Sequence, residues 1–378
     1  MHNERFISVY LYPAIEEMRY KRKIIFLVLL IVILTIMEFV LPNHPHAVVI
    51  YDKYIFLPYQ SLRNLIFGHI PISVGDILYL VGGLCIIIQL LRWIYYVIKF
   101  KTHKHYLATS FLHTVITVEI LYILFIIGWG ANYYKPNIST YWKLNEEQVN
   151  NDSDIIWFDR YLIGKLNYYA PHYHSLTFKE VDKRSIQYYK DYTDSKTKLR
   201  GLGAKASIFG YLMQNLGIQG YYNPFTGEAQ VNRFLPPFML PFVICHEMAH
   251  QSGIAAEDDA NLLSYAIGTT VNDSTFNYSS YFNIWLYAQG KVRHISPKFA
   301  KSLEHELNAL TLSQIDTLRE IRRKYQGKLS DYSGELYDEY LRMHQQKEGI
   351  LSYGKVALSA LVFEQRRLLQ KHFVISIP

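Results

Sequence analysis

The sequence predicts a mainly α-helical protein in which three N-terminal transmembrane helices precede an α+β domain. Three observations carry this prediction. Half of the 378 residues are hydrophobic, and they concentrate in three long apolar runs in the first third of the chain. Beyond about residue 133 the chain becomes polar and rich in tyrosine. Within this second part, the segment "CHEMAHQ" places two histidines four positions apart on a segment that we expect to be helical.

The three apolar runs cover residues 24–41, 77–98 and 106–129. At a rise of ~1.5 Å per residue, each helix is just long enough, or longer, to cross a hydrocarbon core of ~30 Å. One such run is compatible with a buried core helix, but three close together favour a membrane anchor, which we assign to residues 1–132. The first run also lacks the small-residue cleavage site of a signal peptide before Pro42.

Basic residues near the apolar runs predict the orientation of the anchor. Four of them lie at 19–23, before the first run, and three lie at 99–104, between the second and third. The loop 42–76 contains only two such basic residues, Lys53 and Arg63. Since cytoplasmic loops carry the excess of lysine and arginine, we expect a cytoplasmic N-terminus and an extracytoplasmic domain over residues 133–378.

Charge and cysteine content exclude several other classes of protein. The formal net charge is +7, but no dense basic stripe interleaved with aromatic residues exists, so no nucleic-acid partner is expected. The two cysteines, Cys85 and Cys245, lie in different segments and form no CxxC motif. A disulfide framework and a cysteine-rich metal site are therefore not expected. The lipid bilayer is the partner that the composition itself predicts.

The spacing of His246 and His250 indicates a metal site. On a helix, two side chains four positions apart lie on one face, one turn from each other, where both can bind a single ion. Glu247 lies beside the first histidine, where its carboxylate can accept a proton from a water activated by the metal. Pro241 marks the start of the expected helix and Gly253 its end.

Three acidic residues that follow this helix are candidates for a third metal ligand. They are Glu257, Asp258 and Asp259. A catalytic zinc site usually takes three protein ligands and keeps one position open, so two histidines are not sufficient. A second helix is expected to begin near Ala256, and acids in its first turn also suit the positive end of a helix dipole. The spacing alone therefore leaves the third ligand open.

The segment "EDDAN" (residues 257–261) resembles the E-x-x-A-D/N element on the second helix of several glutamate-zincin metallopeptidases. That resemblance implies that Glu257 binds zinc and that Asn261 supports the site. Asp258 remains the main rival of Glu257.

Two further features of a catalytic cleft are expected. "NPFTG" (223–227) predicts the turn of a hairpin. In zincins an edge strand before the metal-binding helix commonly pairs with an extended peptide, and residues 227–233 fit that role by position, although an ordinary core hairpin fits them equally well. A donor that stabilises an oxyanion should also exist, and Tyr353 in "SYGKV" is our candidate.

Four segments, in this order, resemble the integral-membrane family catalogued as domain of unknown function 3810. They are "IPISVGDILYL", "YNPFTGEAQVN", "HEMAHQSGIAAEDDAN" and "SYGKV". The resemblance covers nearly the whole chain. It implies a zincin-like α+β metallopeptidase domain of the glutamate-zincin type behind three membrane helices, but it implies no particular substrate.

These observations predict a membrane-anchored zinc metallopeptidase that hydrolyses peptide or protein substrates close to the membrane. Zn²⁺ would be bound by His246, His250 and Glu257, with Glu247 as the general base and Tyr353 as the oxyanion donor. Two alternatives stay open: a zincin-fold sensor or scaffold that does not cleave, and a metal-dependent hydrolase of a non-peptide envelope component. Glu247 argues against the sensor or scaffold, because a site that only binds metal does not require this carboxylate.

Overall fold

The structure is a computed structural model that describes residues 12–145, 151–191, 201–325 and 353–369, together with the single residues 149, 327 and 331. This part of the chain is mainly helical, as predicted, and contains one small β-sheet. Cys85 and Cys245 are both free thiols.

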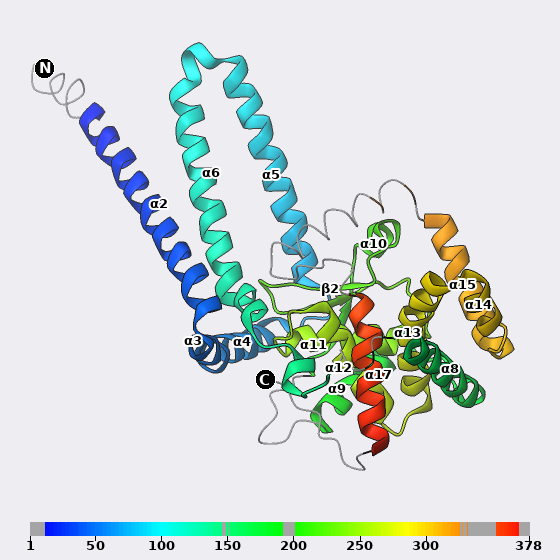
Figure 1. Cartoon of the computed structure of the whole chain (residues 1–378). Helices are drawn as coiled ribbons and strands as arrows, with labels where there is room; N and C mark the ends of the chain where they lie inside the picture. Colours follow the sequence, from blue (N-terminus) through cyan, green and yellow to red (C-terminus); the bar gives the residue numbers. More distant parts are fainter. Residues whose placement is uncertain are drawn as a thin grey trace, which may run out of the picture.

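Three long helices are each apolar enough to cross a membrane. They are α2 (Tyr12–Asn43), α5 (Val74–Ile98) and α6 (Phe100–Gly128). The predicted runs lie inside them, except that Trp129 caps the end of α6. The three helices project together from one side of the folded remainder, and α5 and α6 form a helical hairpin (Figure 1). The prediction of three such helices is confirmed.

A crosswise helical segment joins α2 to α5. It consists of α3 (Pro45–Tyr51), the π-helical turn η2 (Asp52–Phe56) and α4 (Leu57–Phe67), and it lies across the base of α2 and α6 (Figure 1). Phe56 and Arg63 are buried on one face, whereas Ile50 and Leu65 are exposed on another. Helices with such an exposed apolar face are typical of the membrane surface.

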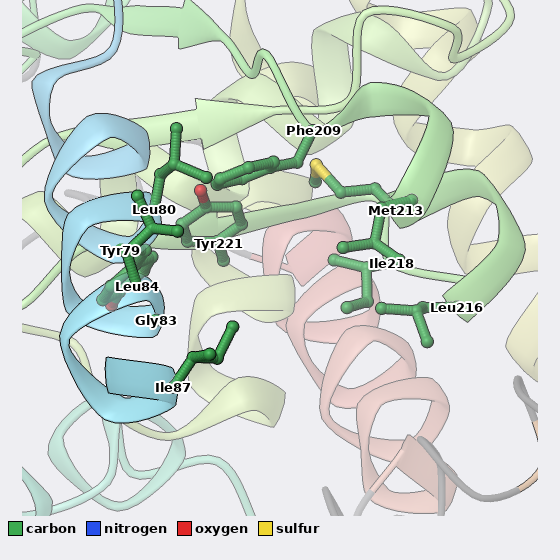
Figure 2. A pocket seen from close by; sticks show the side chains of 11 residues that line it. Tyr79, Leu80, Gly83, Leu84, Ile87, Phe209, Met213, Leu216, Ile218 and Tyr221 are labelled. Atoms are coloured by element: carbon green, nitrogen blue, oxygen red, sulfur yellow. The ribbon is translucent and has the colours of Figure 1, made fainter. Parts of the chain in front are cut away.

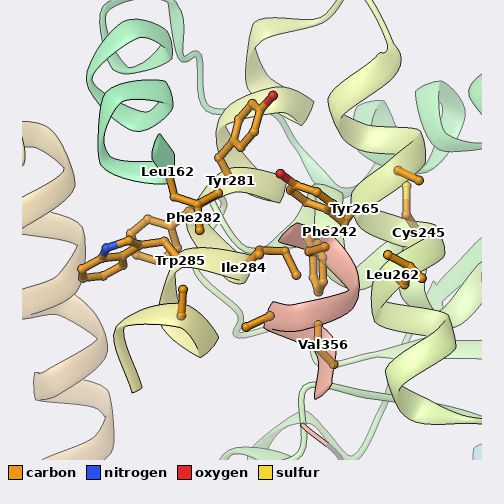
Figure 3. Packing of buried hydrophobic residues seen from close by; sticks show 14 of the residues in the cluster. Leu162, Phe242, Cys245, Leu262, Tyr265, Tyr281, Phe282, Ile284, Trp285 and Val356 are labelled. Atoms are coloured by element: carbon orange, nitrogen blue, oxygen red, sulfur yellow. The ribbon is translucent and has the colours of Figure 1, made fainter. Parts of the chain in front are cut away.

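The folded remainder is built around α13 (Ser274–Ile295), which packs against α8, α11, α12, α14 and α17. Its side chains Tyr281, Phe282 and Trp285 are at most 1% exposed and lie among Leu162 and Tyr265 from neighbouring helices (Figure 3). Burial of each large apolar side chain contributes about 1.5–3 kcal/mol, so this cluster supplies much of the stability. The other helices, in chain order, are η3 (Gly130–Tyr134), α7 (Ile138–Tyr141), α8 (Asp152–Tyr169), η5 (Ala170–His172), α9 (Phe178–Asp191), α10 (Gly210–Leu216), α11 (Leu240–Gln251), α12 (Glu257–Thr270), α14 (Pro297–Glu304), α15 (Ala309–Tyr325) and α17 (Tyr353–Leu369).

The small sheet has the strand order β1-β3-β2. β1 (Ala204–Ala206) runs parallel to β3 (Ala229–Val231), and β2 (Gly220–Tyr222) runs antiparallel to β3. The predicted hairpin is therefore present, with the "NPFTG" segment as its turn. The sheet packs against α11, so the hairpin lies directly beside the helix that carries the two histidines.

Polar contacts join α4 to the β2–β3 hairpin. Gln60 Nε2 donates to the carbonyl of Gly227 (2.9 Å), and the guanidinium of Arg63 donates to the carbonyl of Pro224 and to the hydroxyl of Tyr222 (3.0 Å). Arg63 is only 2% exposed. Each contact joins residues more than 150 positions apart, so the hairpin is held in place by α4.

The start of α5 makes a second set of contacts with the same hairpin. Glu228 accepts hydrogen bonds from the backbone N–H groups of Val74 (3.3 Å) and Gly75 (2.6 Å) and forms an ion pair with Lys205. Asp76, in the first turn of α5, accepts from the hydroxyl of Tyr221 in β2 and from the N–H of Ile208 (2.7 Å), which follows β1. We call the five residues that make these two sets of contacts the hairpin junction; they are Gln60, Arg63, Asp76, Lys205 and Glu228.

Candidate metal centre

Helix α11 carries His246 and His250 on one face, as their spacing predicts. The helix begins at Leu240, with Pro241 in its first turn, and it ends at Gln251. Gly253 follows with a φ of 85°, a left-handed conformation that suits glycine and reverses the chain. The rings of the two histidines are 4.8 Å apart between centroids and perpendicular to each other. Both side chains are largely buried, so any ligand that binds them is shielded from bulk water.

The reversal brings the start of α12 back to the histidines. Its first residue, Glu257, places one carboxylate oxygen 3.1 Å from Nε2 of His246 and the other 3.6 Å from Nε2 of His250. One potential ligand atom from each of the three residues lies within 4.8 Å of the other two. We call His246, His250 and Glu257 the His-His-Glu cluster. Asp258 and Asp259, the other candidates for the third ligand, are not part of it.

A backbone contact orients the ring of His250. Its Nδ1 lies 2.6 Å from the carbonyl oxygen of Ile254, which can only accept a hydrogen bond. Nδ1 must therefore carry the proton, and in the neutral ring Nε2 keeps its lone pair and faces Glu257. The turn at Gly253 thus both reverses the chain and sets the tautomer of His250 that can bind a metal.

The pKa values of the two histidines move in opposite directions in the metal-free protein. Burial lowers the pKa of His250 to about 4, so this ring is neutral at pH 7. Burial also lowers the pKa of His246, but the hydrogen bond and negative charge of Glu257 outweigh it and raise that pKa above its ordinary value. A cation bound between them would interact favourably with the carboxylate of Glu257, as a proton on His246 does.

Glu247 points into a confined space beside the cluster. Burial raises its pKa to about 8, because His246 only partly offsets the loss of hydration and the charge of Glu257 adds to it. Its Oε1 occupies the space that a Cβ at Gly220 would fill, so the strand β2 can approach only because residue 220 is glycine. Its Oε2 is buried without a hydrogen-bond partner among the described residues. A buried carboxyl group of this kind is typical of a functional site, where a bound ligand supplies the missing hydrogen-bond partner.

Two further polar residues lie against the cluster. Asn261, one turn after Glu257 on α12, acts on the pKa of both His246 and Tyr287. Burial and the charge of Glu257 raise the pKa of Tyr287, so its hydroxyl stays protonated at neutral pH. Sequence reasoning missed Tyr287, because it is one of 33 tyrosines and belongs to α13, far from the motif.

Tyr353 cannot be placed in the same way. It is the first residue of α17, but its side chain lies outside the described part of the structure. Its role as an oxyanion donor stays a prediction.

The strand that borders the site is not the one predicted. Residues 227–233 include β3, which lies between β1 and β2 and is therefore the central strand. The edge strand beside the cluster is β2, whose Gly220 contacts Glu247. The edge-strand interpretation of residues 227–233 was wrong, and the alternative, an ordinary hairpin of the core, is what the structure shows. The parallel pairing of β1 with β3 comes from a segment that the hairpin pattern does not reveal.

The end of α6 also reaches the site. The ring of Trp129 meets the ring of His250 edge-on, with 5.7 Å between centroids, and it packs against Tyr222 at 4.4 Å. Trp129 directly follows α6, so the cluster lies beside the C-terminal end of the third apolar helix. Sequence reasoning missed this contact, which joins residues 121 positions apart.

A family model described as "Protein of unknown function (DUF3810)" matches residues 51–359. The chain belongs to this family. Comparisons with curated proteins and with solved structures found no match. The matched residues begin after α2 and include α5, α6, the hairpin junction and the whole His-His-Glu cluster. Membership in the family therefore covers the site but assigns it no activity.

The donor set of the cluster fits zinc. Imidazole nitrogens and a carboxylate are ligands that zinc accepts, and three of them leave a position open in a tetrahedral site. Three buried atoms at this place have no hydrogen-bond partner within the described part of the chain: Nδ1 of His246, Oε2 of Glu247 and Nδ2 of Asn261. Native proteins leave few buried polar atoms unpaired, so this concentration favours a site that binds something.

Proposed function

We propose that the protein is a zinc metallopeptidase anchored in a membrane by α2, α5 and α6. The observation that carries the proposal is the meeting of His246, His250 and Glu257 beside the buried carboxyl group of Glu247. A metal site that only stabilises the fold has its four positions filled by protein ligands, whereas this cluster offers three. We place the N-terminus in the cytoplasm and the cluster outside, as the basic flanks of the apolar helices indicate.

His246, His250 and Glu257 would hold the zinc ion. When bound, the ion supplies positive charge that polarises the scissile carbonyl and makes water a stronger nucleophile at neutral pH. The same charge lowers the pKa of the neighbouring Glu247 below the value of about 8 that it has in the metal-free protein. Glu247 then accepts a proton from water and passes it to the departing amine.

The remaining residues of the site position the substrate and stabilise charge. An extended peptide would pair with the open edge of β2, which brings its backbone next to Glu247 through Gly220. Tyr353 remains our predicted oxyanion donor, and Tyr287 is a second candidate because it lies against Glu257 and Asn261. Trp129 and Tyr222 exclude water on the side of the membrane.

Peptide cleavage by the native protein and by Glu247→Gln tests the proposal. The full chain is needed, since α4 and α5 hold the hairpin, and it is reconstituted in lipid nanodiscs. We expect the native protein to cleave members of a peptide library, and the variant to retain zinc but lose about 10²–10⁴-fold in rate, the usual contribution of a general base.

Zinc retained without peptide cleavage by the native protein would contradict the peptidase assignment and favour a sensor or a hydrolase of another bond. Orientation is tested separately: a reporter inserted after residue 133 that is active only in the cytoplasm would reverse the proposed topology.

A further inference from the structure

An apolar groove lies between α5 and the folded remainder. On one wall are Tyr79, Leu80, Gly83, Leu84 and Ile87, which the helical repeat places on one side of α5. Facing them are side chains from α10 and from the segment that enters β2; they are Phe209, Leu212, Met213, Leu216, Ile218 and Tyr221. Figure 2 shows the two sets of side chains around a common space. The groove has a volume of about 490 Å³, which is within the range of roughly 300–1,000 Å³ that small ligands occupy.

The groove is open along α5. A Cβ at Gly83 would meet no atom within 4 Å, and Leu84 and Ile87 are 52% and 55% exposed. Its lining side chains are apolar except for the two tyrosine hydroxyls, and the hydroxyl of Tyr221 donates to Asp76. The lining therefore offers a ligand hydrocarbon contact and almost no hydrogen bonds.

The position of the groove along α5 places it at membrane depth. α5 has 25 residues, so it is about 37 Å long, about 7 Å more than the hydrocarbon core. The wall from Tyr79 to Ile87 begins about 7 Å and ends about 20 Å from the start of the helix. If α5 crosses the membrane, most of this wall lies within the hydrocarbon layer. The α10 side of the groove must then lie there too.

Exposed apolar residues on and beside α10 also indicate that this side of the groove lies within the membrane. Ile208, Tyr211 and Leu212 are 43%, 67% and 51% exposed, and Phe234, whose ring packs against Tyr211, is 49% exposed. Adjacent exposed apolar residues of this size are unusual on a surface that faces water and mark contact with a membrane or a partner. They continue the apolar surface of the groove away from α5.

We propose that this groove binds an acyl chain of a lipid from the surrounding leaflet. A hydrocarbon chain matches an apolar, open-sided groove whose one wall is a membrane-crossing helix, and the bilayer supplies such chains at high concentration on that side. The proposal rests on α5 crossing the membrane and does not depend on hydrolysis at the metal centre. Tyr221, the middle residue of β2, lines the groove, while the preceding Gly220 contacts Glu247, so the acyl chain lies on the other side of the strand that borders the site.

Photo-crosslinking in nanodiscs tests this site. The full chain is reconstituted with a phospholipid that carries a diazirine in its acyl chain, and labelled peptides are mapped by mass spectrometry. We expect labelling of α10, at Leu212, Met213 or Leu216, in addition to the outer faces of the apolar helices. Labelling confined to α2, α5 and α6, or no labelling at all, would overturn the proposal.

Two neighbouring glycines provide a matched pair of variants. Neither Gly82 nor Gly83 has an atom within 4 Å of its Cβ position, but only Gly83 lines the groove. Gly83→Trp fills the groove and should reduce the labelling of α10 at least about fivefold, whereas Gly82→Trp should leave it unchanged. If Gly83→Trp does not fold, Leu212→Glu on the opposite wall replaces it and should give the same loss of labelling, measured at Met213 and Leu216. Equal labelling of α10 in the native protein and in the folded groove variants would contradict an acyl chain in the groove.

Discussion

Two groups of buried carboxylates lie on opposite sides of the same hairpin, and their surroundings differ. In the hairpin junction, Glu228 and Asp76 accept hydrogen bonds from backbone N–H groups, from hydroxyl groups and, for Glu228, from Lys205. At the candidate metal centre, one oxygen of Glu247 has no hydrogen-bond partner among the residues that the structure describes, and Glu257 faces two imidazoles. In the first group the protein supplies the hydrogen-bond donors, whereas the Oε2 atom of Glu247 in the second group receives none from the described residues.

This difference separates carboxyl groups that stabilise the fold from a carboxyl group whose missing partner a ligand would supply. A buried carboxylate that receives several donors is stabilised by them and fixes the elements that supply the donors, here α5 and β1. A buried carboxyl group without donors lowers the stability of the metal-free fold and is retained where a ligand compensates for it. The comparison therefore predicts that changes in the two groups affect different measurements.

The largest effect is expected at the third ligand. Glu257→Ala should weaken zinc binding at least about 100-fold, because the ion loses one of three protein ligands. Asp258→Ala is the matched control, since the neighbouring acid is not part of the cluster, and it should change the affinity less than about threefold. Competition with a chromogenic chelator measures both. If Asp258→Ala proved the more damaging, the ligand would have to be reassigned.

A smaller effect, on stability rather than on zinc, is expected at the junction. Glu228→Gln leaves the ammonium of Lys205 nearly buried without its carboxylate, and breaking such a pair costs about 3–5 kcal/mol when it is fully buried. We expect a lower midpoint in chemical unfolding with unchanged zinc stoichiometry, and partial recovery in the double variant with Lys205→Met. Loss of zinc from a folded Glu228→Gln protein would show that zinc binding depends on the hairpin junction, contrary to the comparison.

The smallest effect is a change in the pH dependence of the metal-free protein. The pKa of Glu247 is about 8 in the fold, above its ordinary value of 4.5. Between these values the folded protein holds a proton that the unfolded chain has lost, so the stability falls as the pH rises through this window. Glu247→Gln removes this contribution. Its melting temperature with a chelator present should match that of the native protein at pH 5 and exceed it by a few degrees at pH 8. If the melting temperatures of the two proteins changed equally with pH, the raised pKa of Glu247 would be contradicted.

Local sequence signals were sufficient for much of the fold. The three apolar helices follow from hydrophobicity and length, and the limits of α11 follow from Pro241 and Gly253. The "NPFTG" turn identified the hairpin. These features depend on residues close in the chain, where helix breakers and turn formers act directly.

Features that depend on distant residues were not predicted. The parallel pairing of β1 with β3 made β3 the central strand, and nothing in the hairpin pattern signals this pairing. Trp129, at the end of α6, and Tyr287, in α13, lie beside the His-His-Glu cluster, and no spacing in the sequence connects them to the motif. The junction had one indirect signal: "IPISVGDILYL" and "YNPFTGEAQVN" are two of the segments that carried the family resemblance. They meet there, because Glu228 accepts a hydrogen bond from the N–H of Gly75, and the side chain of Gln230 is hydrogen-bonded to that of Ser73.

The metal content of the purified full chain tests the central claim most directly. We expect about one zinc ion per native chain, and less than about a tenth of that in a folded His246→Ala/His250→Ala variant, because only Glu257 would then remain as a ligand. A native protein that is folded yet binds no stoichiometric metal, even after exposure to zinc, would contradict the claim that the His-His-Glu cluster is a metal centre.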